Sequence, residues 1–254
     1  MVSTMATPLH AADGLSESAC RGGDSSGRGG EVHSREHPLA VDGGRIGASG
    51  TRWWVLATFA LLSQLQATGW NFYGPISEQM EAIEGWSLPE IAWLANTANF
   101  TMLLLLPLST SLVRRKGLRI PTLACAALMV CSAVSRCLPV HSGLVPDYAM
   151  GLVSMLCNGA AAGWLTCGGP VISAAWFPAR ERGLATAVIS VSPFIGQSVG
   201  FVAGPLVVPQ GAGAAEGFRR LCVGEAAVCC LLFAAVVMHF PDRPAIPPSL
   251  SAGE

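Results

Sequence analysis

A hairpin of two apolar runs, residues 157–209, constrains this chain more than any other feature of its sequence. The runs are rich in glycine and alanine and flank a short polar break, WFPARERG, that contains Arg180 and Arg182. Each run can cross the roughly 30 Å hydrocarbon core of a bilayer, and the charged break must then lie in water on one side. Charged residues make up 12% of the chain and hydrophobic residues 51%. Soluble domains carry about twice that fraction of charged residues. The composition and the hairpin together therefore predict a membrane protein.

The remaining apolar segments predict an all-α transmembrane fold with six spans. These spans lie at about 53–75, 91–113, 120–139, 147–175, 183–208 and 220–240. The polar, aperiodic segment 1–52 is typical of a disordered tail. Residues 241–254 form a Pro-rich polar segment. We therefore expect three parts: a cytoplasmic tail, a six-span lobe over residues 53–240, and a cytoplasmic Pro-rich segment.

Basic residues are distributed unequally between the two sides of this predicted lobe. Of the basic residues that flank the spans, nine lie on the side of the termini and three on the other, whose first loop is acidic. The nine are Arg45, Arg52, Arg114, Arg115, Lys116, Arg119, Arg180, Arg182 and Arg243, and the three are Arg136, Arg219 and Arg220. The positive-inside rule then predicts that both termini are cytoplasmic. We expect an integral, multi-pass protein of the plasma membrane.

No motif in the chain indicates an enzyme, a cofactor or a metal site. The nine cysteines form no CxxC pair and no Cys/His cluster, and Cys125, Cys131 and Cys137 do not share a helical face at their spacing of six. No nucleophile or paired carboxylate forms a catalytic constellation. We therefore predict no catalytic residue, no metal, no cofactor and no nucleic-acid partner.

Small residues recur along two of the predicted spans. Gly196, Gly200 and Gly204 follow one another every four residues, and Gly159 and Gly163 have the same spacing. Such stripes let helix backbones approach closely. We interpret them as packing surfaces inside one lobe, with homodimerisation through GxxxG as the alternative.

Polar side chains within the predicted spans are few, and most should face a neighbouring helix or a water-filled cavity. They are Gln64, Gln66, Asn71, Asn96, Asn99, Asn158 and Gln197. Their concentration in the first, second, fourth and fifth spans suggests a shared polar path. Glu225 is the only ionisable residue clearly inside a span, near its outer end. This scarcity of ionisable groups favours facilitated diffusion over proton coupling.

Trp70 and Tyr73 lie about one helical turn apart and should present aromatic faces to the same side of the first span. An aromatic face in a dry cavity attracts a cation, especially a quaternary ammonium. The alternative is an interfacial aromatic, because Trp70 lies about 17 residues into the span. We predict a substrate site of Trp70, Tyr73, Asn96, Asn99 and Gln197.

Three motifs resemble those of the major facilitator superfamily. RRKGLR at 114–119 resembles the loop between that family's second and third helices. WFPARERG followed by GLATAV resembles the junction of its fourth and fifth, and the GxxxGP pattern at 200–205 resembles part of its fifth-helix motif. The resemblance implies the six-helix N-terminal lobe of a twelve-helix transporter.

Within that superfamily, residues 51–250 are similar to the feline leukaemia virus subgroup C receptor family, carriers associated with choline, ethanolamine and haem. The segment FPDRPAIPPS at 240–249 contributes to this match. Trp70 then falls where the family has a pocket tryptophan that holds the ammonium head group, and Tyr73 also matches. The family's fifth-helix pocket glutamine falls at Phe194, one turn before Gln197, and Arg114 stands where the family has an acidic residue.

The resemblance implies a facilitative carrier, in the bilayer, of a small organic solute such as choline or ethanolamine. One alternative is a haem or organic-anion carrier, although the spans offer only amides to an anion. Another is a non-transporting, receptor-like or regulatory half-protein. Because such carriers rock one lobe against another, we expect a missing C-terminal six-helix lobe or a partner chain.

Overall fold

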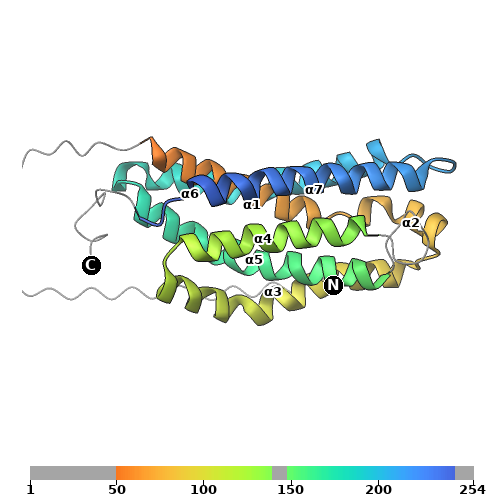
Figure 1. The fold of residues 1–254 in the computed structure, drawn as a ribbon, viewed down its shortest axis with the longest axis horizontal. Coiled ribbons are helices and arrows are strands. Elements are labelled where there is room, and N and C mark those ends of the chain that lie inside the picture. The colour runs from red at the N-terminus through yellow and green to blue at the C-terminus, as the bar shows by residue number, and fades with distance from the viewer. Residues whose placement is uncertain (1–49, 139–147, 244–254) are drawn as a thin grey trace, which may run out of the picture. The chain divides into compact units, whose positions relative to one another are not determined.

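The structure is a bundle of long α-helices. The computed structural model describes residues 50–138 and 148–243, which belong to one compact unit, Gly44–Glu254. Six long helices run side by side in it (Figure 1): α1 (Thr51–Trp70), α3 (Leu88–Lys116), α4 (Arg119–Cys137), α5 (Tyr148–Trp176), α6 (Ala179–Val207) and α7 (Ala214–His239). No strand occurs in the described ranges, so the predicted all-α class is confirmed.

Two of the predicted parts lie mostly outside the described residues. Of the tail at 1–52, only Gly50, Thr51 and Arg52 are described, and the latter two already belong to α1. Of the Pro-rich segment at 241–254, only residues 241–243 are described. The structure therefore describes the helical part of the chain and only a few residues of these two terminal parts.

Five of the helices, α3 to α7, are long and apolar enough to cross a membrane. The described part of the chain therefore belongs to an integral, multi-pass membrane protein. Helix α1 contains the paired Trp53 and Trp54 and two glutamines, Gln64 and Gln66, which lower its hydropathy. Its 20 residues still extend about 30 Å, and α5 and α6 pack along it, so its polar side chains are sheltered from lipid.

The first predicted span, 53–75, does not form one continuous helix. Helix α1 ends at Trp70, and a short 3₁₀ turn, η1 (Gly74–Ile76), leads into α2 (Ser77–Glu84). The glycine-proline pair at 74–75 explains this break, since proline fixes its own φ and lacks a backbone donor. Gly85, with φ of 71°, ends α2, and a capping box of Ser87 and Glu90 starts α3.

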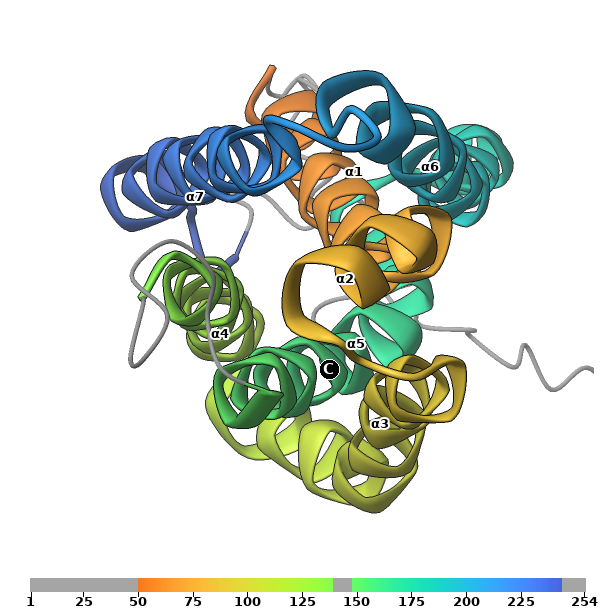
Figure 2. The same ribbon diagram turned by 90° about the vertical axis from the view of Figure 1, so that its right-hand side faces the viewer.

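The other four long helices pack around α1 and α5. Viewed along their axes, α6 and α3 lie on one side of the α1–α5 pair, and α7 and α4 lie on the other (Figure 2). Helix α1 packs mainly on α6, α3 on α5, and α4 on both α5 and α7. The four helices α1, α3, α5 and α6 can therefore border a common space.

Both glycine stripes are buried within this packing. A Cβ atom at Gly196 would overlap the backbone carbonyl of Gln64 in α1, and one at Gly159 would overlap that of Ala98 in α3. Thr68 adds a hydrogen bond of 2.9 Å to the Gly196 carbonyl oxygen. The stripes thus bring α6 against α1 and α5 against α3 inside a single chain.

The polar break of the hairpin lies beside the first turn of α1. Helix α5 ends at Trp176 and α6 begins at Ala179. Arg52 Nη1 lies 3.1 Å from the carboxylate of Glu181, across 129 residues of sequence. The start of α1 and the junction of α5 with α6 are therefore on the same side of the bundle.

Candidate binding cavity

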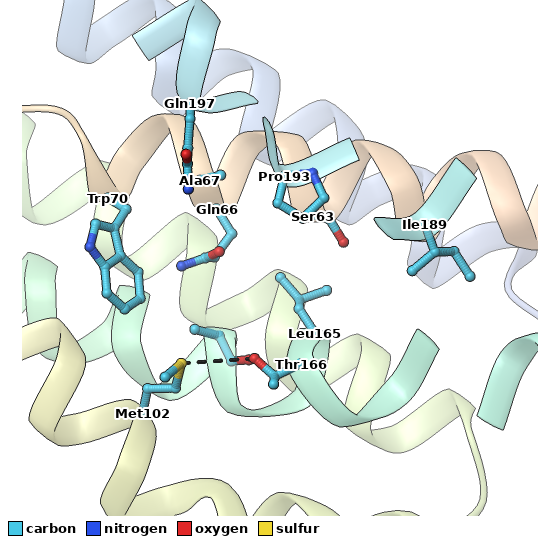
Figure 3. A pocket seen from close by; sticks show the side chains of 11 residues that line it. Ser63, Gln66, Ala67, Trp70, Met102, Leu165, Thr166, Ile189, Pro193 and Gln197 are labelled. Atoms are coloured by element: carbon cyan, nitrogen blue, oxygen red, sulfur yellow. Dashed lines mark hydrogen bonds between the residues drawn. The ribbon is translucent and has the colours of Figure 1, made fainter. Parts of the chain in front are cut away.

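A cavity of about 210 Å³ lies between α1, α3, α5 and α6. Helix α1 contributes Ser63, Gln66, Ala67 and Trp70, and α3 contributes Met102; α5 contributes Ala162, Leu165 and Thr166, and α6 contributes Ile189, Pro193 and Gln197. Figure 3 shows the labelled side chains converging on this space from both sides. The lining is mostly apolar, with a few polar groups, which is typical of a small-molecule site.

Two buried amides fix one wall of the cavity. Gln66 donates from Nε2 to Asn158 Oδ1 at 2.9 Å, and Asn158 donates from Nδ2 to the Gln66 carbonyl oxygen at 3.2 Å. Asn158 is fully buried in α5, whereas Gln66 borders the cavity. Both residues belong to the set of in-span amides, but the predicted site omits them. Their helical spacing alone does not show which amides face one another.

Trp70 lies between two hollows. Its indole borders the cavity, and it also borders a second hollow of about 250 Å³. The second hollow is lined by Trp70, Asn71, Tyr73, Gly74, Ser77, Leu88, Ile91, Ala92, Ala95 and Met155. In Figure 3 the indole projects from α1 toward the side of Met102. An occupant of the cavity can therefore contact an aromatic ring at one end.

Tyr73 does not line the cavity with Trp70. It is 2% exposed and packs among Phe72, Trp86 and Phe218, with ring centroids 5.2–6.4 Å apart. It does border the second hollow. The two aromatic residues therefore meet at that hollow rather than at the cavity.

The predicted amides take three different positions. Gln197 lines the cavity, and Figure 3 shows its side chain pointing from α6 toward α1. Asn99 is exposed and donates to the Ala95 carbonyl oxygen at 3.2 Å, on the same stripe of α3 as Met102. Asn96 is also exposed and lines neither the cavity nor the second hollow. The structure thus brings together Trp70 and Gln197, and leaves both asparagines outside.

None of the eleven residues around the cavity is ionisable. An ion pair lies instead behind α1, where Arg136 Nη2 and Glu225 Oε1 are 2.9 Å apart. Arg136, which we counted among the basic residues that flank the spans on the outer side, instead lies within α4 and is 1% exposed. The prediction that Glu225 is the only ionisable residue in a span is wrong for the same reason.

The sequence does contain a signal for the burial of Arg136. Cys125, Met129 and Ser132 precede it at helical spacing, and all four residues are buried. Counting apolar runs places Arg136 among the last residues of the span at 120–139, and the buried helical face continues through it. At the end of a span, the buried face of the helix is therefore a better guide than hydropathy. An ion pair can bury a charged side chain that hydropathy alone would exclude from the span.

Comparison with known proteins identifies the class to which this arrangement belongs. The family model of the Major Facilitator Superfamily matches residues 59–254. The solute carrier family 49 member 4 homolog of Xenopus tropicalis is 33% identical over 216 residues, which cover 80% of this chain and 47% of that protein.

Two relatives have substrate names. The choline/ethanolamine transporter FLVCR1 of Felis catus is 28% identical over 206 residues, 79% of this chain and 36% of that protein. The choline/ethanolamine transporter flvcr2a of Danio rerio is 27% identical over 204 residues, 79% of this chain and 43% of that protein. The chain thus spans about half the length, or less, of these curated relatives.

Proposed function

The chain belongs to the major facilitator superfamily, and on that premise we propose that its helices form the N-terminal lobe of a facilitative carrier for a small organic cation. The cation is of the choline or ethanolamine kind. The observation that carries this proposal is the indole of Trp70 on the wall of a cavity whose lining residues are all uncharged. Such a ring attracts an ammonium group through its quadrupole, and tryptophan does so best.

The polar groups of the cavity suit the remainder of such a solute. Gln66 and Gln197 border the space from α1 and α6, and Thr166 from α5. Amide oxygens accept hydrogen bonds from a hydroxyl or ammonium group. The names of the two choline/ethanolamine transporters at 27–28% identity support the same substrate class.

An organic anion such as haem fits this cavity less well. Its carboxylates would require a basic residue or several converging donors, and no lining residue carries a positive charge. We therefore favour the cation. The non-transporting, receptor-like or regulatory alternative is distinguished by uptake of labelled choline rather than by binding, since such a half-protein could bind the solute without moving it.

The proposed transport cycle needs a second lobe, because alternating access rocks two lobes around a site near the bilayer midplane. We propose a C-terminal six-helix lobe or a partner chain in that role, with the lobe in the plasma membrane and its termini in the cytoplasm. We propose that this partner faces the side of the bundle bordered by α3 and α6 (Figure 2), since both helices contribute residues to the cavity.

Equilibrium binding of radiolabelled choline and ethanolamine to the purified chain tests the proposal. We expect saturable binding that is lost in Trp70→Ala and retained in Trp93→Ala. Trp93 is a matched control, since it is 58% exposed on α3 and borders neither the cavity nor the second hollow. Equal loss in both variants, or binding that survives in Trp70→Ala, would contradict the cation–π role.

A further inference from the structure

A buried ion pair lies behind the wall that α1 forms for the cavity. Arg136 of α4 donates from Nη2 to Glu225 Oε1 of α7, and their side chains are 0% and 7% exposed. The guanidinium also lies over the ring of Phe72, 4.2 Å from its centroid. Burying charge in a membrane is costly, so an ionisable pair at such a position indicates a functional role.

Gly69 brings this ion pair next to the hydrogen-bonded amides of the cavity. A Cβ atom at Gly69 would stand 2.8 Å from Asn158 Nδ2, 3.0 Å from Glu225 Oε1 and 3.4 Å from Arg136 Nη2. Asn158 is in turn bonded to Gln66, which lines the cavity. Because residue 69 lacks a side chain, polar groups of α4, α5 and α7 can meet on one turn of α1.

The carboxylate of Glu225 has an atom available for a proton. Its Oε2 is buried and makes no hydrogen bond within the described residues. Glu225 also borders a hollow of about 300 Å³ between α1, α6 and α7, which carries the exposed Arg220 and is otherwise mostly apolar. A buried, unpartnered acceptor is costly, and a proton or a water molecule would satisfy it.

Glu225 is the group of this cluster that can change its charge between acid and neutral pH. Among the described residues, the other titratable groups near the pair are Tyr73 after α1, Cys137 beside Arg136 in α4, Cys222 and Cys229 in α7, and Arg220 of the hollow. Tyrosine and cysteine side chains ionise in the alkaline range, and arginine stays protonated. Helix α5 contributes the uncharged Asn158, and the α6 residues of the hollow are uncharged as well.

We propose that Glu225 is a proton-binding site whose occupancy opposes the binding of a cation in the cavity. A proton taken from solvent onto Oε2 neutralises the carboxylate and changes the net charge of the pair from zero to +1. The uncompensated guanidinium then lies one turn of α1 away from the cation site, where the low dielectric strengthens its repulsion. Arg136 can also turn to the side-chain Oδ1 of Asn158 and compete there with Gln66.

This inference rests on the proposed function of the cavity and adds the proton as a second ligand. Thermodynamic linkage requires the effect to be reciprocal, so that a bound cation also lowers the proton affinity of Glu225 by the same factor. Couplings of this kind typically change affinity by roughly 5- to 150-fold. The scarcity of ionisable groups predicts uncoupled transport, whereas the buried pair makes binding sensitive to pH.

The test is equilibrium binding of radiolabelled choline to the purified full chain between about pH 5 and about pH 8. We expect the Kd to rise by roughly 5- to 150-fold as the pH falls. Glu225→Gln should bind with a constant, weak affinity, because Arg136 then keeps its charge uncompensated. The double variant Arg136→Gln, Glu225→Gln should bind with a constant affinity near the wild-type value at neutral pH, because its net charge is zero.

Glu216→Gln is the matched control. Glu216 is an exposed carboxylate of the same helix, paired with Arg220 one turn away, and its removal should leave the pH dependence unchanged. An affinity that is independent of pH in the wild type, or a pH dependence that persists in Glu225→Gln, overturns the proposal. A merely structural ion pair would lower thermal stability in the variants without any effect of pH on binding.

Two further measurements keep the test decisive. If Glu225→Gln does not fold because Arg136 is left unpaired, the double variant carries the comparison, since it removes both charges. If no choline binds at any pH, the proposed substrate fails, and the proton site is tested alone by the infrared carboxyl band. That band should grow on acidification in the wild type and be missing from the double variant; its absence from the wild type overturns the proposal.

Discussion

Gln66 of α1 and Asn158 of α5 hold each other in place through two hydrogen bonds. Gln66 Nε2 lies 2.9 Å from Asn158 Oδ1, and Asn158 Nδ2 lies 3.2 Å from the Gln66 carbonyl oxygen. The first bond engages the donor end of the Gln66 side chain. The amide oxygen is therefore the end that Gln66 can offer to a ligand.

Loss of this partner should weaken ligand binding. We expect Asn158→Leu to lower choline affinity about five-fold, equivalent to the roughly 1 kcal/mol of an interhelical hydrogen bond in a membrane. Asn99→Leu is the control, because that amide is exposed and bonds within its own helix. Titration binding measures both variants, and an unchanged affinity in Asn158→Leu would show that Gln66 needs no support from α5.

Substitution of Trp70 should separate charge recognition from shape. The neutral tert-butyl analogue of choline has a similar volume but no charge, so it loses the cation–π attraction. We expect the wild type to prefer choline by roughly 2- to 30-fold, the equivalent of about 0.5–2 kcal/mol. Trp70→Leu should bind the two compounds equally. A preference for choline that survives in Trp70→Leu places the charge recognition elsewhere.

The close approach of α6 to α1 predicts a sharp difference between two glycines. Gly196→Ala should destabilise the bundle by roughly 1–3 kcal/mol, because the new methyl group overlaps the Gln64 carbonyl. Gly224→Ala should be tolerated, since a Cβ there meets no atom within 4 Å. Thermal unfolding in detergent compares them. Equal midpoints would mean that α6 can move away from α1 at little cost.

The predicted orientation can be read from glycosylation. An Asn-x-Ser acceptor introduced at residues 209–213, between α6 and α7, should be glycosylated, because we place that loop outside the cell. The same acceptor introduced at 178–182, between α5 and α6, should remain unmodified in the cytoplasm. A shift in electrophoretic mobility that an amidase reverses reports each case. Modification of the second acceptor alone would show that the orientation is the opposite of the predicted one.

The sequence predicts the bundle better than it predicts the site. Apolar runs and glycine spacing indicate the helices and the close packing of two of them within the lobe, because both depend on short-range periodicity. Grouping Trp70 with Tyr73 assumes an unbroken helix, and the break after Trp70 turns Tyr73 into the cluster with Trp86 and Phe218. Helical periodicity in a sequence does not indicate where the helix breaks.

The exposed asparagines of α3 illustrate a second limit. A polar residue within a span can face a neighbouring helix, a cavity or another lobe, and only the packing decides which. Asn158 faces α1, whereas Asn96 and Asn99 are exposed. Arg136 shows the same limit for charge, since its partner Glu225 lies 89 residues away in sequence.

The contact between α1 and α6 extends over nearly their whole length. Arg52 pairs with Glu181 near one end, Gly196 meets Gln64 in the middle, and Gly204 meets Ile76 just beyond the other end. Because these two helices are held together at three levels, they should move as one rigid unit when the lobe rocks. Trp70 and Gln197, one on each helix, would then keep their separation, so a bound solute would keep the same pair of contacts while the lobe moves.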